Sequence, residues 1–106
     1  MIVGALRLTF MTTPDGKSTH SMAHKIKDRL WSKFKLALAE LPSNSTGQLV
    51  IGGALVGHDE SQTRERIDQI VKHLNAWGSV ELINDETELV HFDDIEIERD
   101  FEKYDP

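Results

Sequence analysis

Hydrophobic and polar positions alternate over the first ten residues of the chain. Four large apolar residues fall on one side of this pattern: Ile2, Leu6, Leu8 and Phe10. A period of two is typical of a β-strand that buries one face, so we predict a strand over Ile2–Phe10. The segment Thr12–Lys17 contains a proline, an aspartate and a glycine, and is therefore expected to be a turn.

Apolar residues then recur at every fourth position, from about Thr19 to Phe34. This stripe consists of Met22, Ile26, Leu30 and Phe34. Such spacing predicts an amphipathic helix whose stripe faces the core, with Ser18 or Thr19 as its N-cap. Trp31 lies at the rim of the stripe, where we favour packing in the core over contact with a partner.

The next two segments differ in how clearly they predict strands. Lys35–Leu41 alternates, but its residues also favour a helix, so the segment could extend the preceding helix. A loop containing proline, serine, asparagine and glycine follows. Gln48–Gly57 is an apolar run bounded by turn residues, and its length and glycines favour a buried strand.

A second helix is predicted to begin after Asp59, whose side chain can cap it, with Gln62 placed to complete a capping box. Gly78 is expected to end this helix in a left-handed conformation. One face of the helix carries six residues that we expect to face the core: Thr63, Ile67, Ile70, Val71, Leu74 and Trp77.

Ser79–Ile83 and Glu88–Phe92 are predicted to be strands, and Ile95–Glu98 a short extra strand. The resulting order is β-α-β-β-α-β. We therefore expect an α+β protein with the ferredoxin-like arrangement, in which two helices cover one face of a four-stranded antiparallel sheet. Residues 1–92 would form this single domain. Residues 93–106 would form an acidic C-terminal extension that becomes disordered after the short strand.

The composition narrows the class of protein. A length of 106 residues, with 39% hydrophobic and 28% charged residues, is typical of one soluble globular domain. The absence of cysteine excludes disulfides and thiolate metal sites. No apolar run reaches the roughly 20 residues that span a bilayer, and the N-terminus lacks the features of a signal peptide. We therefore expect a cytoplasmic protein without a membrane partner.

The net charge of −6 is unevenly distributed. Residues 1–58 carry seven Lys and Arg against three Asp and Glu, whereas residues 81–106 carry two against eleven. One interpretation is a solvated helix face followed by a solvated tail. The other is a basic surface for an anionic partner, with an acidic segment that repels or competes.

Two short motifs resemble chemical sites, but each lacks residues that the site requires. Gly16-Lys17-Ser18 resembles the end of a phosphate-binding loop, but Met11 stands at the position of its first glycine. His20 and His24 lie one turn apart, but they lack the glutamate of a zinc protease motif and a third ligand. We therefore predict no catalytic residues, no metal, no cofactor and no small-molecule substrate, and hence a protein that is not an enzyme.

Two surfaces remain as candidates for binding a partner. Basic residues of the first helix suit phosphate contacts with RNA, although an ordinary solvated helix face has the same composition. The RNA-binding candidates are Lys17, Lys25, Lys27, Arg29 and Lys33. The uncovered sheet face would be small and apolar, which suits packing against a second copy of the chain better than stacking on bases. The candidates for this homodimer interface are Val3, Ala5, Arg7, Ala37 and Ala39, together with Trp31.

Three segments of the chain resemble the YlxP-like family of small bacterial proteins: "MIVGALRLTF" at 1–10, "IKDRLWSKFKLALAEL" at 26–41 and "GQLVIGGALVGHD" at 47–59. The resemblance covers about residues 1–90 and implies a single ferredoxin-like domain, with Lys35–Leu41 as a strand. Genes of this family often lie beside those for translation initiation and ribosome maturation factors, which implies a ribosomal or RNA partner. No catalytic residues carry over. The chain departs from the family at His20 and Ser21, where arginines are usual, and in residues 91–106, which resemble an extension.

Overall fold

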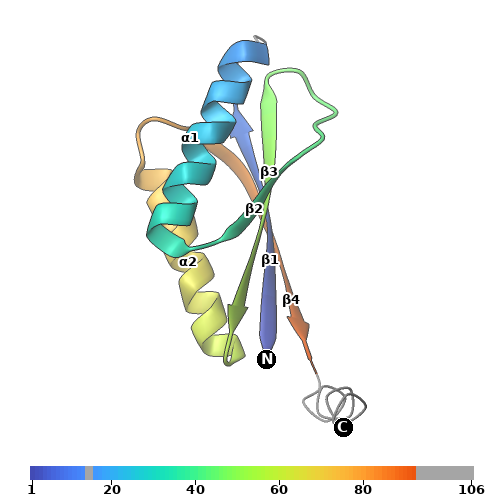
Figure 1. Ribbon diagram of the computed structural model, residues 1–106, viewed down its shortest axis with the longest axis vertical. Coiled ribbons are helices and arrows are strands. Elements are labelled where there is room, and N and C mark those ends of the chain that lie inside the picture. Colours follow the sequence, from blue (N-terminus) through green and yellow to red (C-terminus); the bar gives the residue numbers. More distant parts are fainter. Residues whose placement is uncertain (14–15, 93–106) are drawn as a thin grey trace, which may run out of the picture.

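The computed structural model of the protein describes residues 1–13 and 16–92. This part of the chain forms two helices and four strands in the predicted order. They are β1 (Ile2–Met11), α1 (Gly16–Phe34), β2 (Ala37–Leu41), β3 (Gln48–Gly57), α2 (Glu60–Ala76) and β4 (Leu82–His91). Both helices lie on one face of the sheet, and no described element covers the other face (Figure 1). The predicted α+β, ferredoxin-like fold is therefore confirmed.

The central strand β1 determines which residues face the helices. The strand order is β2-β3-β1-β4, and each neighbouring pair is antiparallel. Side chains alternate between the two faces of a strand, and paired residues share a face. Leu8 and its partner Ile51 are both fully buried under the helices. Arg7 and its partners Gly52 and Glu86 therefore lie on the other side, which we call the open face.

The core lies between the sheet and the helices and follows the predicted apolar stripes. Its buried residues are Leu6, Leu8, Phe10, Ala23, Ile26, Leu30, Leu36, Leu49, Ile51, Leu55, Ile67, Ile70 and Leu74. Full burial of one such large side chain stabilises the fold by about 1.5–3 kcal/mol. Met22 and Phe34, at the two ends of the α1 stripe, are only half-buried. Among the described residues, neither helix is long and apolar enough to cross a membrane.

A close approach between Gly57 and Thr63 positions the start of α2 on β3. Thr63 is fully buried, and its hydroxyl donates a hydrogen bond of 2.7 Å to the carbonyl of Asp59. A Cβ atom on Gly57 would overlap the Oγ1 atom of Thr63. Glycine is therefore required at the end of β3, where a side chain would push the helix away from the sheet.

The ends of α1 differ from the prediction. The helix begins at Gly16 rather than Thr19, so Ser18 and Thr19 lie inside its first turn and the predicted N-cap is wrong. The predicted turn residues Pro14 and Asp15 lie outside the described residues. At the other end, Lys35 has a left-handed φ of 57°, and its N–H donates to the Trp31 carbonyl at 3.0 Å. This arrangement satisfies one of the last carbonyls of the helix.

The start of α2 was predicted correctly and its end was not. Gln62 N–H donates to Asp59 Oδ1 at 2.8 Å, which confirms Asp59 as the N-cap. Gln62 Oε1 accepts from His58 N–H at 3.3 Å, one residue before the N–H that a capping box uses, so the predicted box is only half formed. At its end, α2 leaves through Trp77 in extended conformation, with φ −82° and ψ 105°. Among the described residues, only Lys35 and Gly47 have positive φ. The predicted left-handed cap at Gly78 is therefore wrong.

Two strand predictions also need correction. β2 begins at Ala37, because Lys35 belongs to the cap of α1. One continuous strand, β4 (Leu82–His91), replaces the predicted strands Ser79–Ile83 and Glu88–Phe92 and includes the polar residues between them. The predicted start at Ser79 is wrong, because residues 79–81 precede the strand. The polar residues within β4 are tolerated because it is an edge strand that pairs along the ten-residue β1. The predicted extension 93–106, with its strand at Ile95–Glu98, lies outside the described residues.

Candidate nucleic-acid interface

The basic residues of α1 lie on two flanks of the helix, because the sheet-facing stripe divides them. Lys25, Arg29 and Lys33 recur every four residues, and all three are exposed. This row lies on the flank nearest α2, and we call it the α2 flank. Lys27 is half-buried and lies on the flank nearest β2, beside Trp31 and Ala37.

Trp77 of α2 provides an aromatic surface for the basic row. The Cζ atom of Arg29 lies 4.4 Å from the centroid of the Trp77 ring, and the Nζ atom of Lys25 lies 5.6 Å from it. Contacts of this kind contribute about 0.5–1 kcal/mol each at exposed sites. The sequence placed Trp77 on the core face of α2, but it gave no sign of this contact with α1. Trp77 is half-buried, so the ring both packs on the protein and supports the two cations.

His73 lies behind Trp77 and is held between aromatic rings. Its ring stacks on Trp77 with centroids 6.3 Å apart and meets Phe34 edge-on at 5.6 Å. Among the described residues, its buried Nε2 atom has no hydrogen-bond partner. Burial lowers the pKa of His73 below its usual value, and the positive charges of Lys33 and Arg29 lower it further. The imidazole is therefore neutral at pH 7, and the positive charge of this flank comes from Lys and Arg.

Trp31 lies on the other flank, which we call the β2 flank, and corrects our expectation of core packing. In the structure 56% of the residue is exposed, because β2 runs beside the ring without covering it. The Nζ atom of Lys35 lies 5.3 Å from the centroid of the Trp31 ring. Lys27 and Trp31 line one shallow groove with Leu36 and Ala37.

The structure therefore divides the predicted RNA-binding set. Lys25, Arg29 and Lys33 share the α2 flank, whereas Lys27 lies on the β2 flank. Lys17 lies in the first turn of α1, but its side chain is outside the described part of the protein. Lys35 belongs to the same basic set but was not among the predicted RNA-binding candidates. Its left-handed conformation and its contact with Trp31 could not be predicted from the sequence.

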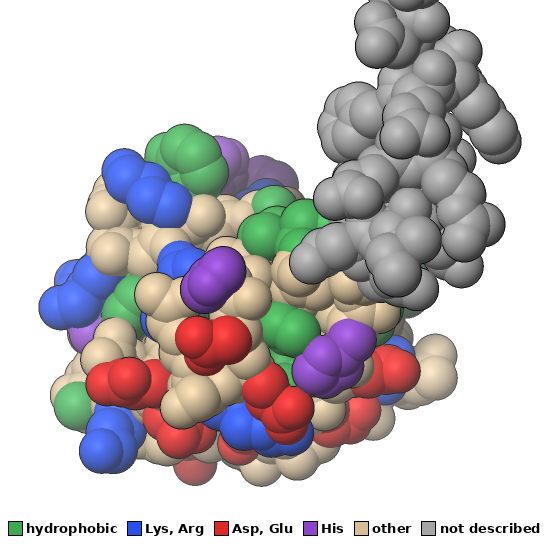
Figure 2. All heavy atoms as spheres, turned by 90° about the horizontal axis from the view of Figure 1, so that it is seen from below, with side chains coloured by type: hydrophobic (Ala, Val, Ile, Leu, Met, Phe, Trp, Pro, Cys, Tyr) green, Lys and Arg blue, Asp and Glu red, His purple; other side chains and the backbone are tan. Residues whose placement is uncertain are grey.

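Basic side chains outnumber acidic ones along α1, whereas the two kinds are mixed at the end of the molecule where α2 begins. Seen from below, acidic, basic and histidine side chains intermix at the end where α2 begins (Figure 2). At this end Glu60 pairs with Arg64 at 3.0 Å and lies 3.6 Å from the Nε2 atom of His91. By contrast, Asp28 is the single acidic residue of α1. An anionic ligand would therefore meet its least opposed positive charge along α1.

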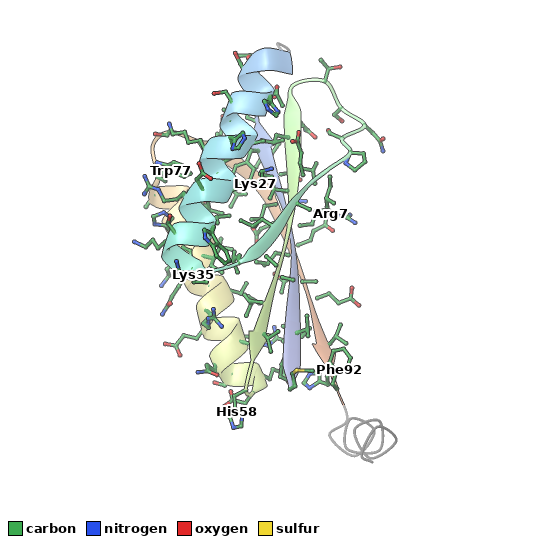
Figure 3. All side chains as sticks on the ribbon, in the orientation of Figure 1. Arg7, Lys27, Lys35, His58, Trp77 and Phe92 are labelled. Atoms are coloured by element: carbon green, nitrogen blue, oxygen red, sulfur yellow. The ribbon has the colours of Figure 1, made fainter. Side chains whose placement is uncertain are left out.

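The open face brings together five of the six predicted interface residues. Val3, Ala5 and Arg7 lie on it from β1, and Ala37 and Ala39 from β2, as the strand register requires. Figure 3 shows Arg7 and Trp77 on opposite sides of the sheet. Trp31, the sixth candidate, belongs to the helix layer and not to this face.

The open face has a charged region in the middle of the sheet and an apolar region at one end. Arg7 pairs with Glu86 at 3.4 Å in the middle of the sheet. At one end Val3 lies between its register partners Val56 and Val90, which are 59% and 41% exposed. The open face therefore has an apolar end next to a solvated ion pair.

The paired histidines of α1 do not form part of a larger cluster. The rings of His20 and His24 meet edge-on with their centroids 5.6 Å apart. Among the described residues, no group of three or more His, Asp or Glu side chains could hold a metal ion. Within residues 1–13 and 16–92, the pair therefore has no third protein ligand of the kind that zinc sites use.

Comparison with known proteins shows the family. A family model described as "Protein of unknown function (DUF503)" matches residues 16–87, so the chain belongs to this family. No curated protein matches the chain. Among solved structures, the de novo designed protein Foldit4 is 8% identical, with 87% of this chain and 98% of that chain covered and a TM-score of 0.48. SnoaB, a cofactor-independent oxygenase from Streptomyces nogalater, is 12% identical, with 87% and 92% covered and a TM-score of 0.46. Neither likeness bears on the function of this protein.

Proposed function

We propose that the protein is a non-enzymatic accessory protein that binds RNA, within a ribosomal particle, through the exposed surface of α1. The observation that carries the proposal is the row of Lys25, Arg29 and Lys33 on the α2 flank. Contact between Arg29 and Trp77 holds one of these cations in place. A cation that is already positioned loses less conformational freedom when it meets a phosphate.

The resemblance to the YlxP-like family supports the choice of RNA over other anions. The chain belongs to the DUF503 family, and we propose that it is a YlxP-like member of that family. The YlxP-like resemblance implies a ribosomal partner. The family description assigns no activity, so the absence of enzymatic function stays a prediction.

In residues 1–13 and 16–92, the acidic side chains of β4 and the basic row of α1 are separated by the sheet. Glu86 and Glu88 belong to β4 and lie on the open face, as partners of Arg7 and Ala5. The basic surface of α1 lies on the far side of the sheet (Figure 1). A phosphate backbone would therefore be attracted to the helix layer and repelled by the open face.

Binding to total RNA and to small ribosomal subunits across a salt series tests the proposal. The parent protein is compared with a Lys25→Glu, Arg29→Glu double variant. A matched control, Arg64→Glu with Lys72→Glu, makes the same change in net charge on exposed positions of α2. If three cations neutralise three phosphates, the logarithm of affinity should fall with that of salt with a slope of roughly −2.

We expect the α1 double variant to lose binding and to flatten this slope, whereas the α2 control keeps both within a few-fold of the parent. Equal losses in the two variants would show a response to net charge alone. Absence of binding by the parent at low salt would refute the proposal.

A second candidate function is a homodimeric protein-interaction module that uses the open face. The observation that favours it is the row formed by Val56, Val3 and Val90, in which Val56 and Val90 are exposed and Val3 is half-buried. Sedimentation at low and high salt should then show a dimer that is insensitive to salt, because apolar packing is not screened. A Val56→Lys variant should be monomeric. A parent protein that is monomeric at high concentration would exclude this function.

A further inference from the structure

The conformation of Lys35 is the least expected feature of α1. A left-handed residue at the end of a helix is usually glycine, because a side chain there crowds the backbone. Here a lysine takes this position, with φ of 57°. The backbone role, in which its N–H bonds the Trp31 carbonyl at 3.0 Å, would be met by glycine as well. What lysine adds is an ammonium group, which lies 5.3 Å from the centroid of the Trp31 ring.

Lys27, Trp31 and Lys35 form a column along the β2 flank, with the tryptophan between the two cations. The helical spacing of four residues places Lys27 one turn from Trp31, and the cation contact places the ammonium group of Lys35 over the Trp31 ring. Trp31 is 56% exposed, the largest exposed fraction of an aromatic residue in the described part of the chain. Its groove is lined by Leu36, Ala37 and Leu38 on the side of β2, and by Lys27 and the acidic Asp28 on the side of α1. An exposed indole beside an apolar groove and two cations combines the features that hold an unpaired nucleotide.

We propose that Trp31 stacks on an unpaired base while Lys27 and Lys35 contact the flanking phosphates, so that the RNA bound by α1 is single-stranded. This inference rests on the proposed function and names the class of RNA. Bases in a duplex are stacked on one another and present only their edges, so an exposed indole gains nothing from them. Phosphate contacts alone require cations and no aromatic ring.

Trp77 does not offer the same site. Its ring already contacts Arg29 and stacks on His73, and the residue is half-buried. A base would have to displace these neighbours, whereas the exposed surface of Trp31 is open. The α2 flank therefore supplies charge, and the β2 flank supplies both charge and a stacking surface.

The test uses a labelled single-stranded RNA oligonucleotide and the same strand annealed to its complement. Affinities are measured by fluorescence anisotropy for the parent, Trp31→Leu and Trp31→Phe. A control, Phe92→Leu, removes another exposed aromatic residue at the end of β4, away from α1 (Figure 3). One base–aromatic stack corresponds to a change of about 5- to 150-fold in affinity. We expect a loss in this range for Trp31→Leu, a smaller loss for Trp31→Phe and none for Phe92→Leu.

Lys35→Gly separates a binding role from a structural one. Glycine relieves the left-handed backbone, so the melting temperature should hold or rise. We expect affinity for the single strand to fall several-fold at the same time. A variant that melts at or above the parent temperature and binds the single strand with parental affinity would overturn the role of Lys35.

The two proposals fail in different ways. Equal affinity for single strand and duplex, unchanged in Trp31→Leu, would overturn stacking and leave RNA binding by α1 intact. No binding of either RNA would defeat the proposed function and this inference together. If Trp31→Leu reduced binding to ribosomal subunits while the parent bound no free RNA, Trp31 would contact a protein, and the inference would again be wrong.

Discussion

The two tryptophans of the chain lie on opposite flanks of α1 and differ in what surrounds them. Trp77 contacts Arg29 and Lys25 and stacks on the ring of His73. Trp31 has a lysine over its ring, but more than half of the residue is exposed. The same residue type beside similar cations therefore has two environments, one packed and one open.

The exposed fraction of the aromatic ring, and not the presence of a cation beside it, therefore distinguishes a structural contact from a candidate binding site. A cation over a packed ring rigidifies the protein, because both partners are already in place. A cation over an open ring can move to a phosphate while the ring accepts a base. The α2 flank is therefore expected to matter for stability and charge, and the β2 flank for recognition.

The largest expected effect is on stability. Trp77→Ala should lower the free energy of unfolding by about 2 kcal/mol, roughly half the cost of removing a fully buried tryptophan. Trp31→Ala should lower it by less than about 0.5 kcal/mol, as is usual at exposed positions. Urea unfolding of the two variants measures this contrast. Equal losses would show that Trp31 is packed like Trp77 and would remove the difference between the flanks.

The sequence predicted the fold well where local pattern and tertiary contacts agree. The alternation in β1 correctly predicted which side of the strand is buried, because the side chains of any β-strand alternate between its two faces. The N-cap at Asp59 was also predicted, because its bond to Gln62 N–H involves only neighbouring residues. The polar stretch within β4 was assigned to neither of the two predicted strands, and its pairing along β1 explains why it is a strand.

The candidate site was predicted less well, because its contacts join distant segments. The row of Lys25, Arg29 and Lys33 follows from the helical period alone. Whether Trp31 is covered depends on where β2 runs, and the contact between Arg29 and Trp77 depends on how α1 and α2 pack. Neither of these is a property of the local sequence.

The pH dependence of stability tests whether the α2 flank is a packed region. Burial, together with the charges of Lys33 and Arg29, lowers the pKa of His73 in the folded protein below its value of about 6.5 in the unfolded chain. The unfolded chain then binds a proton more readily, so this residue favours folding less as the pH falls from 7 through 6.5 towards its lowered pKa.

His73→Phe keeps the ring contacts with Phe34 and Trp77 but cannot be protonated. Thermal unfolding from pH 7.5 to pH 5 should therefore show a smaller loss of stability in the variant than in the parent protein. His24→Phe, on the exposed side of α1, serves as the matched control and should leave the parental pH dependence in place. A variant His73→Phe whose stability falls with pH as steeply as that of the parent would contradict the buried, neutral state of His73.

The smallest expected effect concerns Asp28, the acidic residue that borders the grooves on both flanks of α1. Its charge opposes binding of phosphates on either side, and removing one exposed charge near a ligand changes the interaction only slightly in water. Asp28→Asn should therefore raise the affinity for single-stranded RNA by about twofold at low salt, and the gain should vanish at high salt. Asp68→Asn, on the exposed surface of α2, makes the same change in charge and should have no effect. A gain of equal size in both variants would mean that RNA responds to the net charge of the protein, and that neither flank of α1 is its binding surface.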